Sequence, residues 1–244
     1  KKAIDDNFSK YSPVPGYPAL REAISKKLKD ENNLDYAASE IIVGTGGKQG
    51  VCNAVLALVN PGDEVIIPAP YWVSYPQMVK LAGGVPVIVS AGIEQDFKIT
   101  AEQLEEAITP KTRMIILCSP SNPTGSVYTA EELEALSKVV LAHEDVFVLS
   151  DEIYEHISYI GGHCSIASCF GMKERTILCN GVSKAYAMTG WRIGWVAAPE
   201  WIVKGLNKLQ GQYTSGTCSV SQMAAVAAYV EDQACVAEYR ETFR

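Results

Sequence analysis

Short apolar runs rich in β-branched residues alternate with amphipathic stretches along most of the 244-residue chain. In order, the runs are "EIIVG", "DEVIIPAP", "VPVIVS", "RMIILCSP", "VFVLSD", "RTILCNG" and "IGWVAAP". Strands that are apolar throughout and lead into helices are typical of a mostly parallel sheet with both faces covered. We therefore expect an α/β fold, with three α/β/α layers around a mostly parallel, seven-stranded sheet.

The stretches between these runs carry helix signals. Thr100 with Gln103, and Thr129 with Glu132, fit the capping box that opens an α-helix. No linker, low-complexity tract or internal repeat divides residues 1–244, so we expect one continuous domain. The expected helices include "KQGVCNAVLALV" (48–59), "YWVSYPQMVKLA" (71–82), "TAEQLEEAI" (100–108) and "TAEELEALSKVVLAH" (129–143).

Both ends of the chain fall in helix-like sequence, "KKAIDDNF" at the start and "EDQACVAEYRETFR" at the end. Natural domains more often end in capped or disordered residues. We therefore expect these residues to be the central part of a longer protein.

Charge and hydropathy argue against two classes of partner. The formal net charge is −7 and no run of Lys and Arg is present, so we expect no nucleic-acid surface. Apolar runs such as "AVLALV" (54–59) are far too short to span a bilayer, and no signal-peptide pattern is found, so we expect no membrane partner.

The cysteines indicate a reducing compartment. None forms a CxxC pair, and an odd number spread through apolar segments is typical of buried free thiols, so we expect a cytoplasmic protein. His163 and Cys164 lack a second ligand pair to complete a tetrahedral site, so we expect no metal. The seven are Cys52, Cys118, Cys164, Cys169, Cys179, Cys218 and Cys235.

Polar residues follow several of the expected strands, where ligands bind in open α/β sheets. "GTGGKQ" (44–49) places Gly46, Gly47 and Lys48 at a strand-to-helix junction, where free N–H groups and the helix dipole favour an anion. The motif is neither a Walker loop nor a GxGxxG fingerprint, and a simple tight turn explains it equally well.

Two further motifs offer a ring and an amide. Trp72 in "PYW" is large enough to stack on a flat cofactor, although core packing is the commoner role of a single Trp. Asn122 in "SNPTG" precedes a proline and is held out of the helical region. Its amide could donate to a ligand oxygen, although most Asn-Pro pairs only form turns.

A carboxylate and a lysine follow the next two strands. Asp151 comes directly after "VFVLS", so it is expected to be buried and to need a cationic partner or be neutral. Tyr154 lies three residues later. Lys184 in "NGVSK" is either a solvated lysine near a helix start or an amine with a pKa lowered by nearby positive charge, such as that of Arg192. Together, these residues match the needs of pyridoxal phosphate.

Most of these residues lie in longer motifs, and on five such motifs the chain resembles the class I aminotransferases of the fold-type I pyridoxal-phosphate enzymes. It is most similar to bacterial-type aspartate aminotransferases and aspartate/prephenate aminotransferases. The resemblance implies that residues 1–244 form the cofactor-binding large domain. The N-terminal arm and the C-terminal small domain, with the arginine for the substrate α-carboxylate, would be absent or truncated. The motifs are "YSPVPGYPALREAI", "EVIIPAPYWVSYP", "SPSNPTGSVY", "SDEIYEHI" and "NGVSKAYAMTGWRIG".

The resemblance assigns catalytic roles to three of these residues. Lys184 would form the Schiff base and then move the proton in the 1,3-shift. Asp151 would keep the pyridine nitrogen protonated, so that the ring withdraws electrons. Asn122 and Tyr154 would donate to the phenolic oxygen, with Tyr154 counted among the catalytic residues, and Trp72 would stack on the ring.

The phosphate would be bound, by the same resemblance, by Gly46, Gly47, Lys48 and Arg192. Tyr11 would reach the phosphate of the partner subunit in a homodimer. Three positions depart from the family pattern, namely Gly44, Thr45 and Gly181, where relatives often have Ser, Asn and Ser. Ser183 is a possible substitute for the hydroxyl that is missing at residue 181.

The implied activity is a ping-pong transamination between an L-amino acid, expected to be aspartate, and a 2-oxo acid, expected to be 2-oxoglutarate. Two alternatives are a pyridoxal-phosphate-dependent C–S lyase on cystathionine-like substrates and a non-catalytic pyridoxal-phosphate sensor domain. Release of pyruvate and ammonia without an oxo acid would indicate the lyase. A helix-turn-helix upstream, of which these residues show none, would indicate the sensor.

Overall fold

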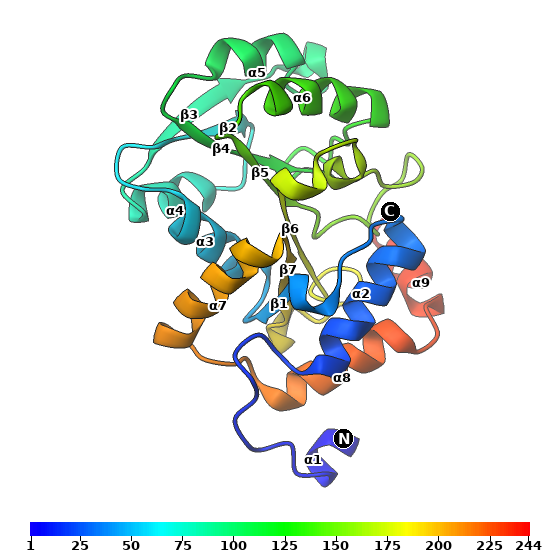
Figure 1. The fold of residues 1–244 in the computed structure, drawn as a ribbon. Helices are drawn as coiled ribbons and strands as arrows, with labels where there is room; N and C mark the ends of the chain where they lie inside the picture. Colours follow the sequence, from blue (N-terminus) through cyan, green and yellow to red (C-terminus); the bar gives the residue numbers. More distant parts are fainter.

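A computed structural model describes all residues 1–244 and contains one seven-stranded sheet (Figure 1). The order across the sheet is β1-β7-β6-β5-β4-β2-β3. All seven expected strands are present, and the α/β prediction is confirmed. The strands are β1 (Ile41–Gly44), β2 (Glu64–Ala69), β3 (Val85–Ser90), β4 (Thr112–Cys118), β5 (Phe147–Asp151), β6 (Thr176–Gly181) and β7 (Gly194–Ala197).

Strand directions put six carboxyl ends at one edge of the sheet. The pairs β2–β3, β2–β4, β4–β5 and β5–β6 are parallel, whereas β7 is antiparallel to both β1 and β6. Only β7 therefore runs in the opposite direction. Its first residue, Gly194, lies at the same edge as the last residues of β1 and β6, Gly44 and Gly181.

Helices cover both faces of the sheet (Figure 1). The helices α3, α4 and α7 pack on one face, while α2 and α8, and farther along α5 and α6, pack on the other. The helices are α1 (Lys2–Asp5), α2 (Pro18–Asn32), α3 (Gly47–Leu58), α4 (Tyr75–Leu81), α5 (Ala101–Ala107), α6 (Ala130–Ala142), α7 (Glu200–Tyr213), α8 (Ser219–Val230) and α9 (Ala234–Phe243).

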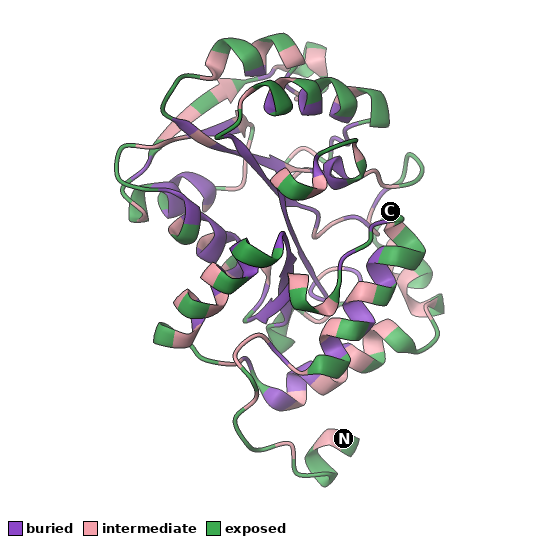
Figure 2. Ribbon diagram, viewed as in Figure 1, coloured by how far each residue is buried: buried purple, intermediate pink, exposed green.

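The core lies against the two faces of the strands, which are buried throughout at the centre of the sheet (Figure 2). Successive side chains of a strand point to opposite faces. In β5, Phe147 and Leu149 therefore join the cluster under α3, α4 and α7, while Val148 joins the cluster under α5 and α6. Continuing the alternation, Asp151 faces α3 and α4, and Glu152 faces the other side.

The strand β3 departs from the expectation of a run covered on both faces. It is the edge strand of the sheet, and its residues are exposed or half-buried, with Val85 and Ile88 largely exposed. Pro86 is accommodated because an edge strand has one side without hydrogen-bonding neighbours. An apolar run therefore predicted the strand but not its place at the edge.

Both expected capping boxes are confirmed. The Thr100 side chain accepts from the Gln103 N–H, and the Gln103 side chain accepts from the Thr100 N–H. Thr129 and Glu132 form the same pair at the start of α6. Each box satisfies two N–H groups that the first turn of a helix leaves without partners.

The prediction that the cysteines are buried is wrong for most of them. All seven are free thiols, but only Cys179 is buried, Cys218 is exposed, and the other five are half-buried. Most lie on helices or in loops at the margin of the core rather than on central strands, which is why apolar neighbours in sequence did not imply burial.

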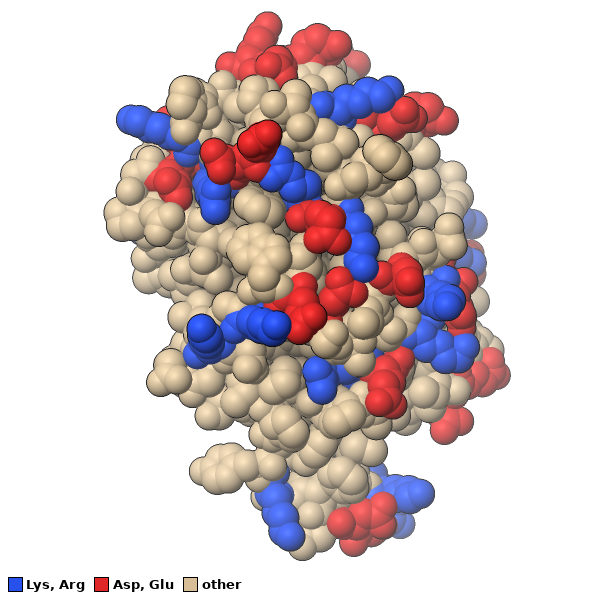
Figure 3. Space-filling view, in the orientation of Figure 1, with Lys and Arg blue, Asp and Glu red and all other residues tan.

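Acidic and basic side chains are interspersed on the face of the molecule shown in Figure 3. None of the helices combines the length and the apolar character required to cross a membrane.

Candidate active site

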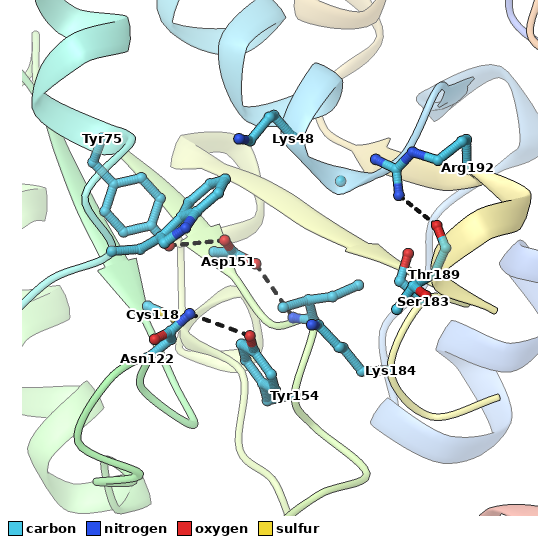
Figure 4. Close-up of a pocket in the computed structure, with 13 residues that line it drawn as sticks. Lys48, Tyr75, Cys118, Asn122, Asp151, Tyr154, Ser183, Lys184, Thr189 and Arg192 are labelled. Carbon is cyan, nitrogen blue, oxygen red and sulfur yellow. Dashed lines mark hydrogen bonds between the residues drawn. The ribbon is translucent and has the colours of Figure 1, made fainter. Parts of the chain in front are cut away.

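A cavity of about 280 Å³ opens at the edge of the sheet where six strands end (Figure 4). Its lining comes from the start of α3, the turn before α4, the ends of β4 and β5, and the connection between β6 and β7. Eight of the ten predicted site residues line it: Gly47, Lys48, Trp72, Asn122, Asp151, Tyr154, Lys184 and Arg192. Segments that are far apart in sequence thus meet at the place expected for ligands in an α/β sheet.

Asp151 is a buried carboxylate that the chain supplies with hydrogen bonds but with no ion pair. The Tyr75 hydroxyl donates to Oδ2 at 2.8 Å, and the Ile153 N–H donates to Oδ1 at 3.3 Å. Burial raises the pKa of Asp151 to about 6, against the opposing effects of these donors and of the Lys184 charge. A carboxylate in this state favours a ligand that brings a positive charge.

Asn122 and Tyr154 point into the cavity as a pair (Figure 4). The Asn122 side-chain amide donates to the Tyr154 hydroxyl at 3.3 Å. The Tyr154 hydroxyl is the acceptor in this hydrogen bond, so its O–H is still available to donate to a ligand. The Asn122 amide likewise has a second N–H. Both residues therefore offer donors to an oxygen placed between them. This pairing favours the ligand role of Asn122 over a turn alone.

Lys184 lies in a turn after β6, and no helix begins there. Its side chain is half-buried, and Nζ lies 5.4 Å from the centre of the Tyr154 ring. The expectation of a helix start at Lys184 is therefore wrong, and its side chain is only partly exposed to solvent. The ammonium group is held over an aromatic face inside the cavity.

The glycine loop and Arg192 are in direct contact. A Cβ on Gly46, whose φ is +82°, would lie 2.3 Å from Nη2 of Arg192, and a Cβ on Gly194 would lie 2.1 Å from the Gly47 N. These positions require glycine because a side chain would fill the space where β7 and the guanidinium approach the loop. The result is a guanidinium beside the first turn of α3, where N–H groups and the helix dipole favour an anion.

Arg192 is itself in the left-handed region, with φ of +56°, and donates through Nη1 to the Thr189 carbonyl at 2.7 Å. Non-glycine residues rarely adopt this conformation, and such residues gather at binding sites. This backbone conformation sets the direction in which the Arg192 side chain leaves the loop.

Lys48 and Trp72 lie together at the opening of the cavity. The Lys48 ammonium lies 4.7 Å from the centre of the Trp72 ring. The Trp72 ring also contacts the edge of Tyr75, with centroids 5.4 Å apart and planes at 89°. Trp72 is half-buried, and its side chain packs against the core and also lines the cavity.

Two predicted residues lie outside the lining. Gly46 is in contact with Arg192, as described above. Tyr11 is fully exposed and borders a different cavity, with Lys10 and Thr217. Tyr11 therefore shares no cavity of its own chain with the other predicted site residues.

Sequence reasoning missed Tyr75, which contacts both Asp151 and Trp72, and it missed Cys118 and Thr189, which also line the cavity. A signal for Tyr75 was present, because it follows Trp72 by three residues; the helix expected over 71–82 begins only at Tyr75, so Trp72 lies in the turn before it. The structure also places Ser183 in the lining, as the sequence suggested.

The departure at Gly181 has a steric cause. A Cβ at this position would lie 2.7 Å from the Ile193 carbonyl and 2.8 Å from the Gly194 Cα, both backbone atoms. A serine would therefore force β6 and β7 apart. Thr45 donates its hydroxyl proton to the Thr217 hydroxyl at 3.2 Å, away from the cavity lining.

His163 pairs with Glu152 rather than with Cys164. Its Nε2 lies 2.7 Å from Glu152 Oε2, on the opposite side of β5 from Asp151. The Glu152 Oε1 atom accepts from the hydroxyls of Ser150 and Ser165 at 2.8 and 2.6 Å. The neighbouring Glu155 is held by the Lys27 ammonium.

Glu152, Glu155 and His163 could bring ligand atoms within 4.8 Å of one another, as a metal site requires. The Lys27 ammonium already lies against Glu155, which also accepts from Asn180 at 2.8 Å. These carboxylates are therefore satisfied by protein donors, and a cation would have to displace an ammonium group.

The donor set at the cavity fits pyridoxal phosphate. An anion cradle with a guanidinium, an indole ring, an unpaired buried carboxylate, two donors and an amine all face one space. These are the groups needed for a phosphate, an aromatic ring, a protonated ring nitrogen, a phenolic oxygen and an aldehyde.

Comparison with known families decides the relationship. The family model described as "Aminotransferase class I and II" matches residues 1–244. The chain belongs to the class I and II aminotransferases. Within this family it is 51% identical to the aspartate/prephenate aminotransferase of Cereibacter sphaeroides, over 100% of this chain and 62% of that protein.

Solved aminotransferase structures share the fold. The aspartate aminotransferase from Rhizobium meliloti superposes with a TM-score of 0.97 and 45% identity, over 99% of this chain and 61% of that one. The aromatic aminotransferase from Pyrococcus horikoshii gives a TM-score of 0.96 and 42% identity, over 98% of this chain and 65% of that one. The chain thus spans about three fifths of the length of these aminotransferases.

Proposed function

We propose that the protein containing this chain is a pyridoxal-phosphate-dependent aminotransferase of the aspartate type. It would move an amino group from an L-amino acid, with aspartate the first candidate, to a 2-oxo acid such as 2-oxoglutarate, in two half-reactions. The observation that carries the proposal is Asp151, a buried carboxylate without an ion pair that shares one cavity with Lys184 and Arg192.

The cofactor, when bound, would supply an electron-withdrawing ring that stabilises negative charge at the substrate α-carbon. Asp151 would hold the positive charge of the ring nitrogen, because its buried carboxylate has no other cation. Asn122 and Tyr154 would donate to the phenolic oxygen. Trp72 would stack on the ring, where its indole excludes water.

The anion cradle would bind the phosphate. Gly47 contributes an N–H group of the first turn of α3, Arg192 contributes its guanidinium, and Lys48 adds a positive charge. The Gly46 N–H donates to the Gly44 carbonyl at 2.9 Å, so Gly46 contributes the space that a side chain would fill. Lys184 would hold the cofactor covalently and would carry a proton to and from the substrate α-carbon. Its amine lies among Tyr154, Ser183 and Thr189, in the lining that faces the space for the substrate.

We also propose that the protein is a homodimer in which Tyr11 reaches the phosphate site of the partner subunit. Tyr11 is fully exposed and lies outside the lining of the cavity of its own chain, and its phenol is a donor suited to a phosphate oxygen. A role in a second subunit gives this exposed aromatic side chain a polar partner.

The choice of aspartate rests on the relatives. One similar protein is named an aspartate/prephenate aminotransferase, and one similar structure is named an aromatic aminotransferase. Because one fold serves several substrates, the substrate is decided by a direct test.

The test follows the bound cofactor by absorbance. L-aspartate added to the purified protein with pyridoxal phosphate should convert the bound cofactor from its aldehyde form to its amine form. 2-Oxoglutarate should reverse the change. Lys184→Ala should bind the cofactor without the covalent bond and lose conversion by several orders of magnitude. Pyruvate and ammonia without an oxo acid would indicate a C–S lyase, and binding without conversion of any amino acid would indicate a sensor.

Mixing two variants tests the dimer in the same assay. Tyr11→Phe should weaken cofactor binding at every site, and Lys184→Ala should inactivate every site. A mixed dimer has one site with both Lys184 and Tyr11 intact, so mixing should restore wild-type affinity at that site. A mixture that behaves as the sum of its two components would contradict the shared site.

A further inference from the structure

Tyr75 is the one side chain that donates a hydrogen bond to Asp151. It is the first residue of α4 and is 1% exposed. Its hydroxyl lies 2.8 Å from Oδ2, while the other oxygen is held by the Ile153 N–H. Each carboxylate oxygen is thereby held from one direction, which restricts rotation about the end of the side chain.

The residues beside Asp151 in the sheet donate no hydrogen bond to its carboxylate. Cys118 on β4 and Cys179 on β6 are the register partners of Asp151 on either side. Their thiols lie 3.4 and 3.3 Å from the Pro120 and Gly47 carbonyls, to which they donate. Thiols are weak donors, and here they are engaged elsewhere.

The Tyr75 hydroxyl is a permanent donor. Burial and the Asp151 charge raise the pKa of Tyr75 well above its ordinary value, so the phenol keeps its proton throughout the range in which Asp151 titrates. Conversely, this donor lowers the pKa of Asp151 and so favours the carboxylate form.

The same residue also holds Trp72. The Tyr75 N–H donates to the Trp72 carbonyl at 3.1 Å, which closes the turn before α4. The two rings meet edge to face, at 5.4 Å and 89°. One side chain therefore contacts both the residue that would stack on the cofactor ring and the residue that would meet its nitrogen.

We propose that Tyr75 is a positioning residue that fixes the position of the Asp151 carboxylate relative to the Trp72 ring. A cationic aromatic ring could then contact both side chains without moving either of them. This inference rests on the proposed function, because it assumes that the ring belongs to pyridoxal phosphate. Tyr75 would act through Asp151 and Trp72 and not by contacting the substrate.

The experiment measures cofactor affinity in Tyr75→Phe, which keeps the ring against Trp72 and removes only the hydroxyl. Pyridoxal phosphate and pyridoxamine phosphate are both titrated into cofactor-free protein, since the second has no aldehyde for Lys184. We expect about tenfold weaker binding of both, the scale of one hydrogen bond to a charged group. In a plot of affinity against pH, the fall in affinity on the acid side (the acid limb) should also move to higher pH. The reason is that Asp151 loses a donor that favours its charged form.

Tyr128→Phe is the matched control. Tyr128 is also buried, and its hydroxyl accepts from the Ile99 N–H at 3.0 Å, but it packs in the cluster under α5 and α6. Its loss should leave affinity and the acid limb unchanged. An equal effect of the two substitutions would show that Tyr75→Phe acts through general stability.

A double-mutant cycle with Asp151→Asn separates the remaining outcomes. If Tyr75 acts through Asp151, Tyr75→Phe should shift neither affinity nor the acid limb further in the Asp151→Asn protein. Full additivity, or wild-type affinity in Tyr75→Phe alone, overturns the inference. Failure of the wild-type protein to bind either compound would instead overturn the proposed function.

Discussion

Asp151 and Glu155 are buried carboxylates only four residues apart, yet their surroundings differ in one respect. Glu155 meets the ammonium group of Lys27 inside the chain, whereas Asp151 meets only neutral donors. Burial alone would raise the pKa of Glu155, but the charge of Lys27, followed by those of His156 and His163, outweighs burial and lowers the pKa to about 2. The pKa of Asp151 is raised to about 6.

The difference separates a carboxylate whose charge is paired within the chain from one whose charge is left without a cation. A buried carboxylate paired within the chain joins its elements, here α2 to the segment after β5. A buried carboxylate left without a cation lowers the free energy of unfolding of the empty protein. A ligand that brings a positive charge offsets this loss when it binds. Strand alternation contributes to this division by sending Asp151 to the side of α3 and α4.

The largest expected effect comes from removing the cation of the paired carboxylate. Lys27→Met leaves Glu155 buried and unpaired and should lower the free energy of unfolding by about 3–5 kcal/mol in urea denaturation. Lys26→Met is the control, because the Lys26–Asp30 pair is exposed and should contribute less than about 0.5 kcal/mol. Adding Glu155→Gln to Lys27→Met removes the unpaired charge and keeps an acceptor for Asn180, so it should recover part of the loss. Equal effects of the two lysines would contradict the comparison.

A smaller effect of opposite sign is expected at Asp151. Because its pKa is raised from 3.8 to about 6 in the folded state, ionisation destabilises the empty protein as pH rises through this range. Asp151→Asn should therefore increase the free energy of unfolding of cofactor-free protein by about 3 kcal/mol at pH 7, and by almost nothing at pH 4.

The control for this variant is Asp145→Asn, whose carboxylate is 89% exposed and should show no such pH dependence. Pyridoxal phosphate should reverse the gain in Asp151→Asn, since it stabilises the ionised wild-type residue instead. A stability difference that is the same at pH 4 and pH 7 would refute the account of Asp151.

The smallest effect is expected at His163. Burial opposes its charged form, but the hydrogen bond and charge of Glu152 raise the pKa of His163 above its ordinary value. The stabilisation is therefore present below pH 6.5 and is lost as pH rises through the folded pKa. His163→Gln should lower the free energy of unfolding by about 1 kcal/mol at pH 5 and leave it unchanged at pH 9. His143→Gln at an exposed pair with Glu105 serves as the control.

Local sequence predicted the features that depend on local pattern. The seven strands, the capped helices and the position of Asp151 at a strand end all follow from apolar periodicity and from the polar residue that interrupts it. The cluster of eight site residues followed once their strands were taken to end at the same edge.

Features that depend on tertiary contacts were not visible in the sequence. The contact of Tyr75 with Asp151 joins residues 76 positions apart, and that of Lys27 with Glu155 joins residues 128 apart. The exposure of β3 depends on which strand lies at the edge, and the reversed direction of β7 depends on its partners. Burial of the cysteines likewise depends on packing rather than on apolar neighbours along the chain.

The reversed direction of β7 has a mechanical consequence. Since β6 and β7 are antiparallel neighbours, the connection between them leaves and re-enters the same edge of the sheet, and Lys184 and Arg192 both lie on it. A ligand bonded to Lys184 and also bound by Arg192 would connect two points of this loop. The two ends of the loop are already anchored in β6 and β7. Occupancy of the cavity would then make the loop more rigid and would restrict the motion of Lys184.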